Sequence, residues 1–326
     1  MKRILSFALL IFVLLSALAA CTPTETPGDD VTVRIAGMTG PTSMGLVKLA
    51  EDNANGLTEQ KYEITTTYAK ADEITPKLVN GELDMAALPA NVAATLYGRT
   101  NGAIQVLAIN TLGVVNIVEK GESIQDFSDL VGKKIYAIGR GTTPEYGLRY
   151  LLAENNVNYE DLTIEWKSAA TEILPLLKTE ENAVAMIPQP FATAAQLQVE
   201  GLRVAINLDE EWSKLDNGTQ FVTGVLVARK AFIEEHPEAV ATFLSEYEAS
   251  INYAKANVAE TAPLVVKYGI MGSEPLAKAA LPNCNLAFIA GAEMKTVLSG
   301  YLGTLNDLNP EAVGGAMPAD DFYYVG

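Results

Sequence analysis

The stretch VTVRIAGMTGPTSMGLVKLAEDN, residues 31–53, contains a predicted strand, a glycine-rich loop and a predicted helix, in that order. Apolar and polar residues alternate over 31–38, as in a β-strand, and the apolar spacing becomes helical from Met44 onward. A glycine-rich loop between a strand and a helix can hold a phosphate, carry the nucleophile of a hydrolase or bind another small molecule. The stretch predicts an α/β fold and leaves open what the loop binds.

Strand and helix patterns alternate along the rest of the chain. Further strands are predicted at residues 62–68, 83–88, 103–110, 113–120, 132–139, 162–167, 182–187, 202–208 and 221–232. Helical patterns separate most of them, and the chain beyond 232 is predicted to be helical. This repetition favours an α/β fold with right-handed crossovers.

The order of these segments predicts two α/β lobes. Segments near 109–118 and 221–228 would cross between them as a two-strand hinge. Lobe 1 would then comprise residues 31–111 and 222–326, and lobe 2 residues 112–221. Because open α/β sheets bind ligands at the carboxyl ends of their strands, we expect a ligand cleft between the lobes.

The first 30 residues predict export and anchoring. Lys2 and Arg3 precede an apolar run that ends in small residues, which is typical of a secretory signal peptide over 1–20. The sequence LAAC, ending at Cys21, resembles a bacterial lipobox, which implies cleavage before Cys21 and lipidation of its thiol. The alternative is a plain cleavage site beside an incidental cysteine. Residues 21–30 predict a tether, so we expect an extracytoplasmic protein anchored to the cell membrane.

The composition excludes several kinds of partner. The chain has 40 acidic and 23 basic side chains, a net charge of −17, which disfavours nucleic acid and anionic lipid surfaces. An anionic ligand held locally by backbone N–H groups stays possible. Acidic stretches such as LDEEW, residues 208–212, are interpreted as solvated surface. Cys284 is interpreted as a buried small hydrophobe, and we expect a monomer.

Catalytic patterns are weak. After Gly40 the first lysine is Lys48, too late for a P-loop, and Pro41 stands where a nucleophile turn around Ser43 needs glycine. The single histidine, His236, precedes a proline that begins a helix, so neither a Ser-His pair nor a His/Cys metal site is supported. We expect no catalytic residues, no metal and no cofactor. A secreted hydrolase or transferase is the alternative, and a sensor or adhesion lipoprotein is a third class.

Four loops follow predicted strands and lead into predicted helices, at residues 38–45, 88–91, 139–147 and 187–192. Free N–H groups at a helix start, with the helix dipole, favour an anion or a polarised carbonyl. Hydroxyls such as those of Thr42 and Thr143 are equally compatible with ordinary helix caps. Four such loops from two lobes together indicate a ligand cleft.

Charged and aromatic side chains in these loops leave alternatives open. Arg140 is the best placed charge for an anionic group, but Glu145 could pair with Arg140 or with Arg149. Tyr146 and Phe191 could stack on a flat ligand or belong to the core.

Four segments carry a resemblance to a known family: VTVRIAGMTGPTSMGLVKL (31–49), GELDMAALPANVAATLY (81–97), DLVGKKIYAIGRGTTPEYGLRYLL (129–152) and HPEAVATFL (236–244). They resemble solute-binding lipoproteins of ABC importers, in the branch for sulfonates, nitrate and thiamine-pyrimidine precursors. The resemblance covers most of residues 31–310. It implies a two-lobed, periplasmic-binding-protein-like (type II) fold with two hinge-crossing strands. It also implies a non-enzyme that delivers a solute to a permease and its ATPase.

The resemblance places the ligand between the four loops and the hinge. The expected ligand-binding residues are Met38, Thr39, Pro41, Thr42, Ser43, Met44, Leu88, Pro89, Ala90, Asn91, Asn110, Thr111, Arg140, Gly141, Thr142, Thr143, Glu145, Tyr146, Pro188, Gln189, Pro190, Phe191 and Thr223. No clear cluster of basic residues marks these loops. A neutral or heteroaromatic solute, such as a vitamin precursor, therefore fits them at least as well as an anion.

Overall fold

The computed structural model describes residues 31–326. The predicted signal peptide, Cys21 and the tether lie outside the described residues. Within 31–326 no helix has both the length and the apolar character needed to cross a bilayer.

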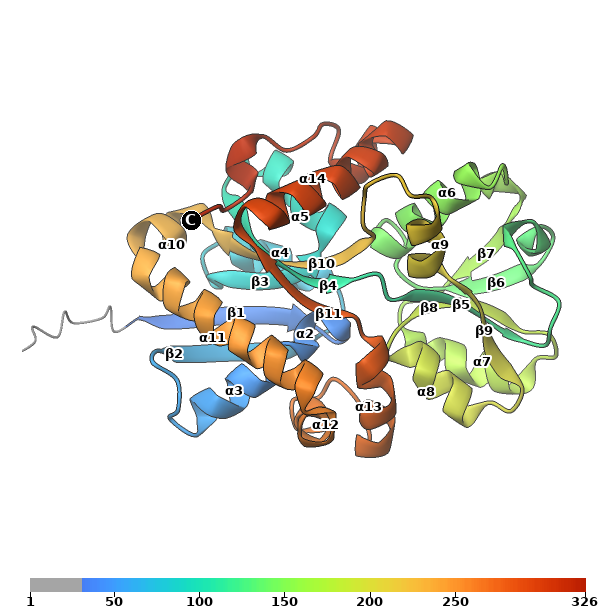
Figure 1. Cartoon of the computed structure of the whole chain (residues 1–326), viewed down its shortest axis with the longest axis horizontal. Helices are drawn as coiled ribbons and strands as arrows, with labels where there is room; N and C mark the ends of the chain where they lie inside the picture. Colours follow the sequence, from blue (N-terminus) through green and yellow to red (C-terminus); the bar gives the residue numbers. More distant parts are fainter. Residues whose placement is uncertain (1–30) are drawn as a thin grey trace, which may run out of the picture. The chain divides into compact units, whose positions relative to one another are not determined.

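The first sheet has six strands in the order β11-β4-β10-β3-β1-β2 (Figure 1). Its strands are β1 (Thr32–Met38), β2 (Lys61–Tyr68), β3 (Met85–Pro89), β4 (Ile104–Leu112), β10 (Val222–Arg229) and β11 (Leu286–Ala290). β1 pairs parallel with β2 and β3, whereas β10 runs antiparallel between β3 and β4. Every residue of β3 is buried, as expected for a strand covered on both faces.

The second sheet has five strands in the order β7-β6-β8-β5-β9. They are β5 (Val115–Lys120), β6 (Lys134–Ala137), β7 (Thr163–Trp166), β8 (Val184–Pro188) and β9 (Leu202–Asn207). We call the elements around the first sheet lobe 1 and those around the second sheet lobe 2. The chain crosses between the sheets after β4 and returns before β10, and the exact lobe boundaries stay a prediction.

Helices cover both sheets. They are α2 (Pro41–Met44), α3 (Val47–Ala54), α4 (Ala71–Val79), α5 (Ala90–Arg99), α6 (Thr143–Glu154), α7 (Ile173–Thr179), α8 (Phe191–Gln198), α9 (Leu208–Lys214), α10 (Lys230–Glu235), α11 (Pro237–Ala256), α12 (Val258–Lys267), α13 (Glu274–Ala280) and α14 (Gly291–Leu308). Short 3-10 turns are η1 (Phe127–Leu130), η2 (Tyr159–Asp161), η3 (Ala170–Glu172), η4 (Leu281–Asn283), η5 (Pro310–Val313) and η6 (Asp320–Phe322). In lobe 1, α3, α11 and α12 pack on one face of the sheet, and α4, α5 and α14 on the other (Figure 1).

The structure differs from the sequence expectations in three elements. The single helix expected after the first loop is two helices, α2 and α3, separated at Gly45. β11 adds a strand where only helices were predicted, because its five residues gain their partner in β4. The LDEEW stretch forms α9, whose N-terminus is capped by the Asn207 side chain, which accepts from the N–H groups of Asp209 and Glu210.

An aromatic group lies where the lobes meet. Trp212 of α9 stacks on Phe221 at 5.1 Å between ring centroids, and Tyr301 of α14 lies 5.5 Å from Trp212. All three rings are buried. Because Trp212 belongs to lobe 2 and Tyr301 to lobe 1, one apolar core joins the two lobes beside the hinge crossings.

Candidate ligand-binding site

The second and third predicted loops meet across the two lobes. The side-chain amide of Asn91, in the first turn of α5, donates to the carbonyl of Gly141 in lobe 2 over 3.1 Å. Thr143 Oγ1, at the start of α6, lies 3.4 Å from Asn91 Oδ1 and 3.4 Å from the carbonyl of Thr223. Loops that are about 50 residues apart in the sequence are thus joined at the beginning of β10.

The first loop packs against the beginning of β10, where the second and third loops meet. Asn110, near the end of β4, donates to the Thr42 carbonyl over 3.2 Å, and Thr111 Oγ1 donates to Asn110 Oδ1. Gly224 allows this approach, because a Cβ there would lie 2.4 Å from Thr42 Cγ2 and 2.6 Å from Asn110 Oδ1. We call Thr42, Asn91, Asn110, Thr143 and Thr223 the seam cluster. All five are buried and uncharged.

Three hydroxyls at or beside the seam cluster have no hydrogen-bond partner among the described residues. They are Thr223 Oγ1, Tyr247 Oη and Tyr301 Oη, and all are buried. Burial raises the pKa of both phenols, and it is opposed by a polar interaction of the Tyr247 hydroxyl with the Asn110 side chain and of the Tyr301 hydroxyl with Thr143, both outside good hydrogen-bond geometry. An unpartnered buried hydroxyl costs about 1–3 kcal/mol, and at this seam the Thr223 hydroxyl is the one that no neighbouring side chain compensates.

The structure shows which arginine pairs with Glu145 of the third loop. Glu145 Oε2 accepts from the Gly141 N–H over 2.7 Å, and Glu145 Oε1 accepts from Arg149 and from the Tyr159 hydroxyl. Glu145 therefore pairs with Arg149 and shapes the loop. Arg140 is exposed and forms neither an ion pair nor a hydrogen bond with any described residue, which leaves its guanidinium available.

The fourth loop is tied to lobe 1. Gln189 Oε1 accepts from the N–H and hydroxyl of Thr193, and the Asn283 amide donates to the same hydroxyl over 3.1 Å. The Gln189 N–H donates to the Val114 carbonyl at the first crossing. This loop therefore contacts both the hinge and η4 of lobe 1.

The remaining predicted residues fall into two groups. Met44, Leu88 and Ala90 are fully buried members of the apolar cores. Ser43 Oγ donates to the Met38 carbonyl over 2.7 Å and closes the first loop on itself. Pro41, Pro89 and Pro190 are also buried, whereas the more accessible residues are Met38, Thr39, Gly141, Thr142, Tyr146, Pro188 and Phe191.

Sequence reasoning missed Tyr247 and Tyr301. They lie on α11 and α14, more than a hundred residues from most of the loops they approach, and each sits in an ordinary helical apolar pattern. Only the tertiary structure brings their hydroxyls to Asn110 and Thr143.

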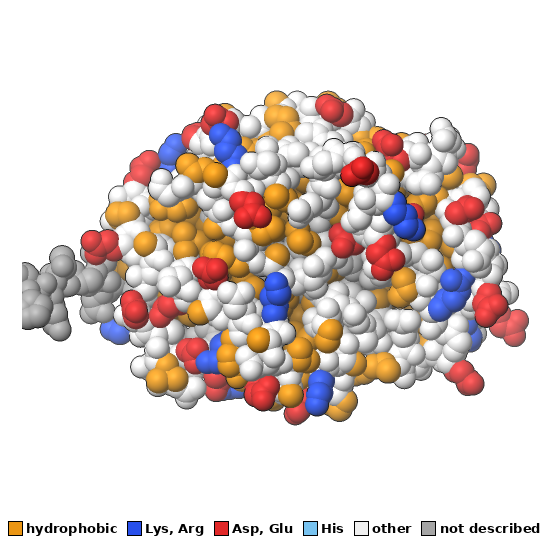
Figure 2. Space-filling view, in the orientation of Figure 1, with side chains coloured by type: hydrophobic (Ala, Val, Ile, Leu, Met, Phe, Trp, Pro, Cys, Tyr) orange, Lys and Arg blue, Asp and Glu red, His pale blue; other side chains and the backbone are white. Residues whose placement is uncertain are grey.

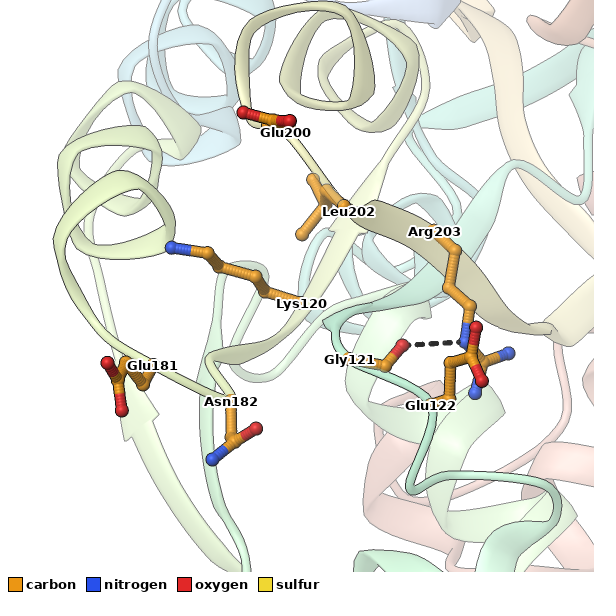
Figure 3. A pocket seen from close by; sticks show the side chains of 9 residues that line it. Lys120, Gly121, Glu122, Glu181, Asn182, Glu200, Leu202 and Arg203 are labelled. Carbon is orange, nitrogen blue, oxygen red and sulfur yellow. Dashed lines mark hydrogen bonds between the residues drawn. The ribbon is translucent and has the colours of Figure 1, made fainter.

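Two surface hollows lie elsewhere. One, of about 610 Å³, lies at an end of lobe 2 and is lined by side chains of mixed charge, including Lys120, Glu181 and Arg203 (Figure 3). The other, of about 370 Å³, includes Tyr150 and Asp307. Neither contains a predicted site residue, and both are open to solvent. No three His, Cys, Asp or Glu side chains within 31–326 are grouped to hold a metal ion.

The chain is similar to known proteins both in sequence and in fold. The family model described as NMT1/THI5 like matches residues 101–261. The structure of an ABC transporter protein from Parabacteroides distasonis superposes with a TM-score of 0.73 at 22% identity, covering 90% of this chain and 99% of that one. The periplasmic aliphatic sulphonate binding protein of Escherichia coli gives a TM-score of 0.68 at 17% identity, covering 87% and 95%. The fold is that of the periplasmic binding proteins.

This fold confirms the fold class expected from the sequence, and the NMT1/THI5-like match fits the expected resemblance. A Brucella abortus protein named as a binding protein is 24% identical over 205 residues. That match covers 60% of this chain and 62% of the relative, so the chain spans less than two thirds of it. Because ligand sites occur preferentially at domain interfaces, the seam between the two α/β lobes is the place where a ligand could contact both.

Proposed function

We propose that this protein is a non-catalytic solute-binding protein that holds a small molecule at the seam cluster. The observation that carries the proposal is the buried Thr223 hydroxyl, which lacks a partner among the described residues at the point where loops of both lobes meet.

Binding would act through the equilibrium between separated and joined lobes. A solute that contacts both lobes stabilises the joined arrangement by its differential affinity for it. The Asn91–Gly141 and Thr193–Asn283 hydrogen bonds are interlobe contacts of the kind such a solute would reinforce. The joined surface would then be recognised by the permease of an ABC importer, with its ATPase, and the solute released to it.

The solute class follows from the side chains at the seam. Hydroxyls and amides there favour a polar molecule with several hydrogen-bonding groups. A heteroaromatic vitamin precursor, with Tyr146 and Phe191 half-buried nearby in the loops, meets this description. An anion is the second candidate, since Arg140 is unpaired among the described residues and helix α6 begins at Thr143.

The proposed setting is outside the cytoplasm, with a lipid on Cys21 holding a monomer at the membrane. The visible face carries acidic side chains spread among fewer basic ones, with no large basic patch (Figure 2). Together with the net charge of −17, this surface disfavours nucleic-acid binding.

The decisive experiment identifies the solute. The protein is purified under native conditions and denatured, and the released small molecules are analysed by mass spectrometry. The compound is then added back in a calorimetric titration of wild type and of Thr223→Val, which removes the hydroxyl and keeps the shape. About tenfold weaker binding by Thr223→Val is expected for one lost hydrogen bond.

The matched control is Thr296→Val on the exposed side of α14. Equal affinities for wild type and both variants would contradict a site at Thr223. Turnover of the released compound would favour the enzyme alternative. Binding without uptake by a reconstituted permease would favour a sensor.

A further inference from the structure

A buried carboxylate lies in the third loop, beside the seam cluster. Glu145 is the third residue of α6, and only 7% of its surface is exposed. Its Oε2 accepts from the Gly141 N–H over 2.7 Å. Its Oε1 accepts from Arg149 Nε and Nη2, over 3.1 and 3.0 Å, and from the Tyr159 hydroxyl over 2.9 Å. We call the point where this N–H, this guanidinium and this hydroxyl converge the anion position.

Arg149 and Tyr159 support each other at the anion position. The Arg149 guanidinium lies over the Tyr159 ring, with 3.5 Å between its central carbon and the ring centroid. Burial, followed by the hydrogen bond to Glu145, raises the pKa of Tyr159 to about 12, so the hydroxyl keeps its proton and donates it. The side chains of α6 and η2 thus form a fixed set of donors that suits a carboxylate.

Three N–H groups of the third loop already have acceptors within it. The Gly141 N–H, at a left-handed φ of 73°, donates to Glu145. The Thr142 N–H donates to the Gly139 carbonyl over 3.1 Å, and the Glu145 N–H donates to the Thr142 carbonyl over 3.0 Å. Pro144 has no N–H to offer. An anion at this loop would therefore compete with Glu145 for its donors.

The charges around Tyr146, a predicted ligand residue, also disfavour an anion. Tyr146 is half-buried in lobe 2, and Glu311 of η5 acts on it electrostatically from lobe 1. Burial raises the pKa of the Tyr146 phenol, and the carboxylates of Glu145 and Glu311 raise it further, whereas Arg149 lowers it. The surroundings of this phenol thus oppose a further negative charge.

We propose that Glu145 determines the charge of the solute: its carboxylate fills the anion position, so the seam cluster admits an uncharged polar molecule and rejects an anion. The statement about the solute rests on the proposed function. The filled anion position does not, and it can be tested with no solute present.

The selection follows from the cost of an unpaired anion. The Gly141 carbonyl accepts from Asn91 across the seam, while the N–H of the same residue is held by Glu145. A solute carboxylate or sulfonate at this point would either displace Glu145 from Arg149 or remain without these donors. In both cases one anion is left desolvated and unpaired. An uncharged hydroxyl, amide or ring nitrogen meets neither cost, so the protein's own carboxylate acts against anions.

The test empties the anion position and offers it a small anion. Glu145→Ala is melted in sodium formate and in sodium chloride, at equal ionic strength and neutral pH. Formate carries the carboxylate that the variant lacks, so at about 0.1 M it should raise the melting temperature by roughly 1–4 °C relative to chloride. Should the variant not fold in chloride, the same two salts are compared by the fraction of protein that refolds.

The wild type and two further variants should melt alike in both salts. In wild type the position is filled, and Glu145→Gln fills it with a neutral side chain of the same shape. Glu165→Ala is the matched control in lobe 2: its carboxylate is paired with Lys134 and Lys167 but is 42% exposed, so its removal leaves no enclosed position. No formate effect in Glu145→Ala, or an equal one in Glu145→Gln or Glu165→Ala, would overturn the proposal.

A second measurement tests the consequence for the solute. The compound released from wild type should carry no negative charge at neutral pH. In calorimetry, methanesulfonate should bind Glu145→Ala at least about tenfold more tightly than wild type. An anionic compound from wild type would overturn the selection against anions. Failure to release any compound would instead count against the proposed function alone, because the formate comparison needs no solute.

Discussion

Asn91 in lobe 1 donates its side-chain amide to the carbonyl of Gly141 in lobe 2, across the seam between the two sheets. Its side-chain oxygen accepts from the Thr143 hydroxyl, so one buried asparagine bridges the lobes through both its amide nitrogen and its amide oxygen. Because the contact exists only when the lobes are joined, it connects the local geometry of the loops to the closure of the cleft.

Asn91→Ala should weaken solute binding roughly thirtyfold, since two interlobe hydrogen bonds of about 1 kcal/mol each are lost. Calorimetry with the co-purified compound measures the change. Asn55→Ala, on an exposed helix end of lobe 1, is the control and should bind like wild type. Unchanged affinity in Asn91→Ala would remove this residue from the closure mechanism.

Arg140→Ala separates the two candidate solute classes. The guanidinium is exposed and unpaired among the described residues, so its loss should weaken an anionic solute strongly and a neutral one little. Titrations at low and moderate salt, with Arg99→Ala as an exposed control, make the comparison. If the identified solute is an anion and its affinity does not change, Arg140 lies outside the site.

Asp84→Asn should destabilise lobe 1 by on the order of 3 kcal/mol, because Asp84 is a buried partner of two arginines. It pairs with Arg34 of β1 and with Arg229 at the end of β10, both at 2.7 Å. The measurement is urea unfolding at neutral pH. A variant as stable as wild type would show that the two arginines find other partners.

Asp84 also predicts a pH dependence in wild type. Burial by itself raises the pKa of this carboxyl, but the hydrogen bonds from Arg34 and Arg229 outweigh it, so the pKa lies below 3.8. The stabilisation is therefore complete above 3.8 and is lost as the pH falls through the lower, folded-state value. Unfolding curves in acid should show this loss in wild type and not in Asp84→Asn.

Gly147→Ala should cost about 1–3 kcal/mol of folding stability, as overpacking typically does. A Cβ there would lie 2.5 Å from Phe221 Cζ, and the ring is held by Trp212. Gly303→Ala is the matched control, because it is also helical and has no atom within 4 Å of the new Cβ. It should stabilise by about 0.5–1 kcal/mol through helix propensity. Equal melting temperatures for both variants would contradict this account.

The order of strands and helices could be predicted because it depends on periodicity within a few residues. β11 could not, since its five residues become a strand only through pairing with β4. The acidic pattern indicates a solvated Asp209, whereas the structure places its carboxyl half-buried beside the distant Gly113 and Asn285. The Asn207 cap two residues earlier was the local signal that a helix begins there.

The site divides in the same way. The loops at strand ends are visible in the sequence, and the structure brings Asn91, Gly141, Thr143 and Thr223 together. Which hydroxyls lack partners depends on packing among segments as far apart as Asn110 and Tyr247. Contacts between segments so far apart in the sequence cannot be predicted from a local sequence pattern.

The aromatic group between the lobes provides an optical signal. Of the two tryptophans, Trp212 is buried against Phe221 and Tyr301, whereas Trp166 lies in β7, away from the contact between the lobes. Any shift of α14 relative to α9 changes the surroundings of the Trp212 indole and therefore its emission wavelength and quenching. Titration of the unlabelled protein in a fluorimeter, with Trp166→Phe to remove the background, would follow lobe movement in real time.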